Sequence, residues 1–160
     1  MIGRSPAGGR KFLVIIDDTP ECGQALLYAA LRAQRTGATV LAAVVAAKSE
    51  FQHWLGVEER MREEAEEEAN EMLDRAFRAL GNHNLDEPER RIVVATRTEG
   101  IREIIGDDPA IAVLVLAAAA GSDGPGPLVN AIAGGQSGGY PVPVTIVPGG
   151  LTTEEIEAIA

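Results

Sequence analysis

The chain has 160 residues, of which 46% are hydrophobic and 24% are charged, and these values are typical of one globular domain rather than a disordered segment. Fourteen lysines and arginines stand against twenty-four aspartates and glutamates, which gives a net charge of −10 at pH 7. This acidic balance argues against nucleic-acid binding and against an anionic membrane as partner, because both would be repelled.

Residues 1–10 contain neither an apolar run nor helical periodicity. After them, short apolar runs alternate with segments of helical periodicity. Three glycines, a proline and two arginines occupy residues 1–10, so we expect a flexible tail. The run Phe12–Ile16 is continuously apolar and ends at Asp17, which is typical of a strand buried on both faces of a parallel sheet. Further strands are predicted over 39–46, 91–96, 111–117 and 141–148, and helices over 22–33, 57–80, 99–106, 152–160 and directly after the glycine-rich segment 121–128.

Capping patterns mark the ends of two of these helices. Gly37 follows the first helix and suits a left-handed C-terminal cap. At the other end of the chain, a threonine precedes two glutamates within residues 152–155, which is the pattern of a capped helix start. We therefore assign residues 11–150 to one domain and residues 151–160 to a short C-terminal helix.

The alternation of strands and helices predicts an α/β domain with a mostly parallel five-stranded sheet and helices on both faces. In such sheets, ligands bind outside the carboxyl ends of the strands. Three loops follow strands at that edge, namely residues 17–20, 46–50 and 117–128. We expect these three loops to form the functional site.

The loop after the fourth strand is rich in glycine, and glycines between a strand and a helix let backbone amides approach a phosphate. Pro125 and Pro127 have no amide hydrogen, however, and Asp123 repels an anion. Neither the P-loop lysine pattern nor the dinucleotide-binding glycine pattern is present. The spacing is therefore compatible with an anion-binding loop or with a simple turn.

Gly121, Gly124 and Gly134 follow the spacing G-x2-G-x9-G, which resembles the signature of the universal stress protein family. The resemblance extends to Asp17 at the end of the first strand and to the closing strand Pro143–Val147, and it covers residues 11–148. It implies a Rossmann-like fold of the adenine nucleotide alpha hydrolase type, with strand order 3-2-1-4-5. It also implies a cytoplasmic stress-response domain that binds an adenine nucleotide, ATP or AMP, without efficient turnover, and that is not an enzyme.

By the same resemblance, the carboxylate after the first strand and a backbone position near the end of the second strand hold the adenosine, while the glycine loop holds the phosphates. Members of the family commonly pair the edge of the fifth strand across a two-fold axis, so a homodimer is also expected. The resemblance places these contacts at Asp17, Val44, Gly121, Gly124 and Gly134, and Thr19, Ser122 and Gly135 complete the set of candidate nucleotide-binding residues.

One departure from the family pattern leaves a second hypothesis open. The family has serine or threonine directly after its last glycine, whereas this chain has Gly135, and Ser137 is out of step. The alternative is a member without nucleotide that acts as a protein-interaction or regulatory module. Asp17 and Thr19 each have a second interpretation, as caps of the first helix.

Other residue types that often mark chemistry give weak signals here. His53 and His83 have no partner at metal-ligand spacing, so loop positions are expected for both. Cys22 is the single cysteine and is interpreted as a small core residue; with no internal disulfide possible, it fits a reducing cytoplasm. The sequence contains neither a nucleophile elbow nor a run of ~20 apolar residues long enough to span a membrane.

Overall fold

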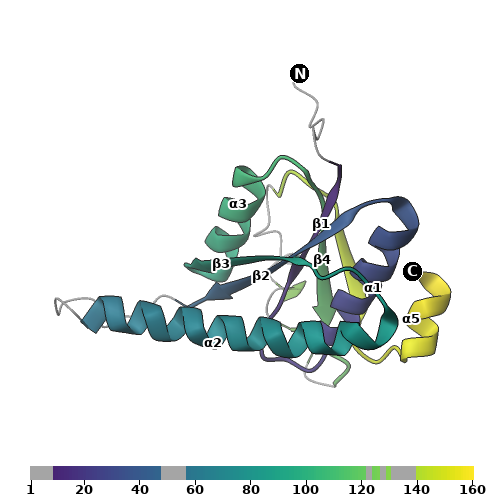
Figure 1. Ribbon diagram of the computed structural model, residues 1–160, viewed down its shortest axis with the longest axis horizontal. Helices are drawn as coiled ribbons and strands as arrows, with labels where there is room; N and C mark the ends of the chain where they lie inside the picture. Colours follow the sequence, from purple (N-terminus) through teal and green to yellow (C-terminus); the bar gives the residue numbers. More distant parts are fainter. Residues whose placement is uncertain (1–8, 48–56, 122–123, 127–128, 131–139) are drawn as a thin grey trace.

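The computed structural model of the chain, shown in Figure 1, describes residues 9–47, 57–121, 124–126, 129–130 and 140–160. The expected tail over residues 1–10 and the helix after the glycine-rich segment lie mostly outside these ranges. His53, Ser122, Gly134, Gly135 and Ser137 lie wholly outside them.

Five parallel strands form the sheet, in the order β3-β2-β1-β4-β5. This confirms both the α/β fold and the strand order 3-2-1-4-5. Because β1 lies in the middle, it pairs with β2 on one side and with β4 on the other. The strands are β1 (Lys11–Ile15), β2 (Thr39–Ala46), β3 (Glu89–Val94), β4 (Ile111–Ala118) and β5 (Val144–Pro148).

Helices cover both faces of the sheet. Figure 1 shows α1, α2 and α5 on one face and α3 on the other. A short 3₁₀ turn, Gly81–His83, follows the long second helix. The described helices are α1 (Cys22–Thr36), α2 (Val57–Leu80), α3 (Arg97–Asp107) and α5 (Thr153–Ile159).

The central strand β1 supplies side chains to two separate hydrophobic cores. Val14 and Ile16 belong to the core beneath α1, α2 and α5, whereas Leu13 and Ile15 belong to the core beneath α3. Successive side chains of a strand point to opposite faces, so a strand that is apolar at every position must be covered on both sides. The continuous apolar run in the sequence has this origin.

Some element boundaries differ from the sequence predictions. The fifth strand was expected from residue 141 but begins at Val144, because Pro141 and Pro143 lack the amide hydrogens that a ladder requires. Pro143 still contributes its carbonyl oxygen, which accepts from the amide of Leu114 at 2.9 Å. The third helix begins at Arg97, two residues earlier than expected, because Thr96 caps it by accepting from the amide of Glu99.

The two predicted helix caps are confirmed. Gly37 has a φ of 72° at the end of α1, which is the left-handed conformation that glycine adopts without strain. Thr152 and Glu155 form a reciprocal capping box at the start of α5. These caps fix where α1 turns into β2 and where the C-terminal helix begins.

Helix α3 approaches the sheet closely at Gly100. A Cβ atom at this position would come within 2.6 Å of Cγ1 and 3.0 Å of Cγ2 of Val45 in β2. Distances this short are below van der Waals contact, so only glycine lets α3 pack at this depth on β2. The position of α3 therefore depends on the absence of a side chain at residue 100.

We predict that Gly100→Ala lowers the free energy of unfolding by about 1–2 kcal/mol, because overpacking against the branched Val45 outweighs the helix propensity gained from alanine. Urea denaturation monitored by circular dichroism measures the change. Gly106→Ala in the same helix is the matched control, since a Cβ there meets no atom within 4 Å, and it is expected to be neutral or stabilising. Equal effects at both positions would contradict the packing argument.

Candidate functional site

The chain leaves the sheet after β1 through a turn that Asp17 organises. The amide of Ile16 still donates to the carbonyl oxygen of Ala43 at 2.8 Å, so the pairing with β2 continues to the residue before Asp17. Asp17 Oδ1 then accepts from the amide of Thr19 at 3.0 Å and from the Thr19 hydroxyl. This is the local hydrogen bonding by which aspartate stabilises a turn.

The interpretation of Asp17 and Thr19 as caps of the first helix is wrong. Helix α1 begins at Cys22, its N-cap residue is Glu21, and no side chain caps it by a hydrogen bond. The hydroxyl of Thr19 donates to Asp17 instead, and Asp17 binds an amide of the turn rather than one of the helix. Both side chains therefore serve the turn that leads to the helix.

A cavity of about 480 Å³ lies at the carboxyl ends of β1, β2 and β3, between α2 and the start of α3. This size falls within the usual range for small-molecule sites, about 300–1,000 Å³. Its walls come from four parts of the fold: the end of β1 with its turn, the end of β2, the face of α2 toward the sheet and the β3–α3 junction. The lining residues are Ile15, Ile16, Asp17, Asp18, Val44, Val45, Ala46, Ala47, Ala65, Glu68, Ala69, Met72, Ala95, Thr96 and Arg97.

The cavity brings together only part of the predicted site. Asp17 and Val44, predicted from different strands, both line it. Thr19 is not among the lining residues, and neither are the described glycines Gly121 and Gly124. The first two loops thus meet at one cavity, whereas the expected shared cavity with the glycine loop is not observed for the described part of that loop.

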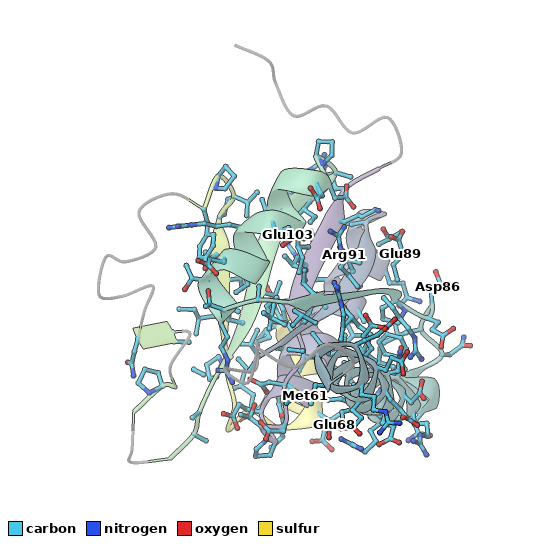
Figure 2. All side chains as sticks on the ribbon, turned by 90° about the vertical axis from the view of Figure 1, so that its left-hand side faces the viewer. Met61, Glu68, Asp86, Glu89, Arg91 and Glu103 are labelled. Atoms are coloured by element: carbon cyan, nitrogen blue, oxygen red, sulfur yellow. The ribbon has the colours of Figure 1, made fainter. Side chains whose placement is uncertain are left out.

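Two walls of the cavity were missed by sequence reasoning. Helix α2 contributes Glu68 and Met72, and the β3–α3 junction contributes Thr96 and Arg97. Figure 2 looks nearly along α2 and shows Glu68 at the lower edge of the molecule, toward the end where the central strand finishes in Figure 1. A signal was available in the sequence, because the third strand of a parallel sheet ends at the same edge as the first two.

The cavity has an apolar floor and a charged rim. Val44 and Ala69 are buried, whereas Glu68 and Arg97 are exposed. A site of this kind can hold an apolar ring against the floor and bind polar groups at the rim. The apolar stripe of α2 that faces the sheet therefore has two roles, since it packs on the core and also closes one side of the cavity.

The described part of the glycine loop folds back on the end of β4. Gly124 and Gly126 have φ values of 92° and 101°, which favour glycine strongly. The amide of Ala119 donates to the carbonyl oxygen of Pro125 at 3.1 Å, and the amide of Asn130 donates to that of Gly126 at 2.9 Å. These two glycines are thus explained by the turn that they form.

Cys22 and His83, which the sequence analysis also considered, have structural environments; His53 lies outside the described residues. Burial raises the pKa of the Cys22 thiol, whose sulfur lies 3.4 Å from the carbonyl oxygen of Asp17, so the thiol is poorly ionised at neutral pH. His83 lies on the 3₁₀ turn, with Nδ1 at 3.5 Å from a carboxylate oxygen of Glu157 in α5. Within the described residues, no group of three or more metal-ligand side chains occurs, and no helix has the length and apolarity to cross a membrane.

Known structures share this fold. Universal stress protein UspA from Lactobacillus plantarum is 19% identical, with 86% of this chain and 97% of that chain covered and a TM-score of 0.67. A universal stress protein from Archaeoglobus fulgidus in complex with dAMP is 16% identical, with 86% and 96% covered and a TM-score of 0.54. A universal stress protein family protein from Arabidopsis thaliana with AMP bound is 16% identical, with 91% and 94% covered and a TM-score of 0.56.

No curated protein matches the chain by sequence. The sequence model of the universal stress protein family, in contrast, matches residues 9–124, which span β1 to the glycine loop and include the whole described cavity. Together with the parallel sheet of order 3-2-1-4-5, this match shows that the chain belongs to the universal stress protein family.

Proposed function

We propose that this chain is a stress-response domain that binds an adenine nucleotide in the cavity at the carboxyl ends of β1, β2 and β3. The observation that supports this most directly is that Asp17 and Val44, the two residues expected to hold adenosine, line the same cavity. The adenine ring would pack on the apolar floor at Val44, and the carboxylate of Asp17 would accept hydrogen bonds from the ribose hydroxyls.

Similar structures with bound ligands support an adenine nucleotide as the class of ligand. Universal stress proteins have been solved with AMP, with dAMP and with cAMP, and each of these ligands is an adenine nucleotide with a single phosphate group. Those ligands belong to those proteins, which share the fold with this chain at 16–18% identity. Their common chemistry agrees with the apolar floor and polar rim of the cavity described above.

The protein is proposed to bind the nucleotide without efficient turnover and to act in the cytoplasm. Neither histidine nor cysteine occurs among the described lining residues, and the nearby Cys22 thiol is held protonated by burial. A single cysteine in the sequence fits a reducing compartment. A member that binds no nucleotide and acts through protein interaction is the second candidate, and the observation that favours it is that Gly121 is exposed and does not line the cavity.

The first test is thermal unfolding with and without AMP. At a free ligand concentration of about 100 times Kd, binding to the folded state adds about 2.7 kcal/mol, which corresponds to a rise in Tm of roughly 5–10 °C for a domain of this size. Differential scanning fluorimetry measures the shift, with GMP as the comparison for base recognition. An unchanged Tm at millimolar AMP and ATP would favour the protein-interaction candidate.

The position of the site is tested by Asp17→Ala. Loss of charged hydrogen bonds to the ribose costs about 1.5–3 kcal/mol, so the Kd for AMP is expected to rise by about 10- to 100-fold in isothermal titration calorimetry. Thr19→Ala is the matched control, because Thr19 bonds the same carboxylate but lies outside the cavity lining, and a much smaller change is expected. An Asp17 variant with unaltered affinity would mean that the nucleotide binds elsewhere.

We also propose a homodimer that forms through β5. This strand lies at the end of the sheet and pairs only with β4 among the described strands, so its outer edge offers free ladder groups to a second copy. Ile146 on β5 is 42% exposed, which adds an apolar contact at that edge. Pairing of two such edges would continue the sheet from one copy into the other.

Light scattering of the purified protein at tens of micromolar tests this proposal, with a mass of twice 16.8 kDa expected. Ile146→Lys is expected to shift the mass toward the monomer, because a lysine on an edge strand opposes pairing. Ile159→Lys provides the matched control, since Ile159 is 57% exposed but lies on α5, and this variant should remain dimeric. A monomeric mass for the unaltered chain would exclude the dimer at these concentrations.

A further inference from the structure

We infer that the cavity selects adenine mononucleotides over ATP, so that the ligand of this chain carries one phosphate group. This inference rests on the proposed function and concerns the charge of the ligand rather than its base. Its basis is the balance of charges around the cavity. Three carboxylates, from Asp17, Asp18 and Glu68, line the cavity together with one guanidinium group, from Arg97.

Among the described residues, no other part of the fold neutralises these four charges. None of the four side chains forms an ion pair with an oppositely charged side chain among the described residues, although surface pairs such as Lys11 with Asp108 occur elsewhere. Three negative charges against one positive charge give the described part of the rim a formal charge of −2. The whole chain, at −10, adds to the same field.

Each additional phosphate group increases the repulsion from this rim. ATP carries about two more negative charges than AMP near neutral pH, and the energy of repulsion grows with the product of the charges. Arg97 can pair with one phosphate group, because a guanidinium group binds phosphate oxygens in a bidentate manner. The described lining has no second lysine or arginine for a further phosphate group.

Three residues at the start of the glycine loop offer no free amide hydrogen to a phosphate group. Pro125 and Pro127 have no amide hydrogen, and the amide of Ala119 already donates to the carbonyl oxygen of Pro125. These three residues therefore supply no free amide hydrogen to the outer phosphate groups of ATP.

Isothermal titration calorimetry of the full chain with adenosine, AMP and ATP, each with and without Mg²⁺, tests this inference. AMP is expected to bind at least about tenfold more tightly than ATP, a difference of about 1.4 kcal/mol. The ratio should fall when ionic strength rises from about 0.01 M to about 0.1 M, because the Debye length shrinks from about 30 Å to about 10 Å and the repulsion is screened.

Glu68→Gln removes one carboxylate of the rim while preserving the size of the side chain. We expect it to improve ATP binding about threefold and to change AMP binding less, which is the scale of a solvent-exposed charge interaction. Glu67→Gln changes the net charge of the protein equally, but Glu67 does not line the cavity, so the ratio should stay at the value of the unaltered chain.

ATP binding as tight as AMP binding, with or without Mg²⁺, would overturn the inference and leave the proposed function intact. Equal effects of Glu68→Gln and Glu67→Gln would overturn the role of the rim charges. Absence of binding by adenosine, AMP and ATP alike would instead remove the proposed function, and the inference would fall with it.

Discussion

The site depends on the burial of β1 on both faces of the sheet. Because the side chains from Leu13 to Ile16 alternate between two hydrophobic cores, a polar side chain at any of these four positions would leave an unpaired group in one core. The first position where a carboxylate can stand is the residue after the last buried one, which is Asp17. The same constraint that stabilises the sheet therefore places the carboxylate at its carboxyl edge.

The close contact between α3 and β2 extends this constraint to the shape of the cavity. Val45 packs against Gly100 and also lines the cavity, so the depth at which α3 sits determines where one of its walls stands. Helix α2 closes the cavity from the other face of the sheet with Ala65, Ala69 and Met72, while most of its glutamates are exposed to water. One helix thus presents apolar side chains to the cavity floor and acidic side chains to water, with Glu68 at the boundary between them.

The sequence was informative where a residue has one local physical role and less so where the role depends on packing. The strand order came from the family resemblance, while the continuous apolar runs and Gly37 came directly from side-chain burial and backbone conformation. Thr19 was misjudged because hydroxyl groups cap helices and stabilise turns with the same chemistry, and only the observed start of α1 distinguishes them. Glu68 and Arg97 were missed because the spacing of apolar residues along a helix does not show how deeply that helix packs on the sheet.

The expected nucleotide site has two halves, one for adenosine and one for phosphate groups, and different kinds of structure form them. The half expected to hold adenosine is built from strand ends whose positions follow from the sheet, and this fold is shared with structures at 16–19% identity. The half expected to hold phosphate groups is a loop, where a proline removes an amide donor from the backbone. Substitutions in a loop can therefore change the donors offered to a phosphate group while the apolar runs that build the sheet stay the same.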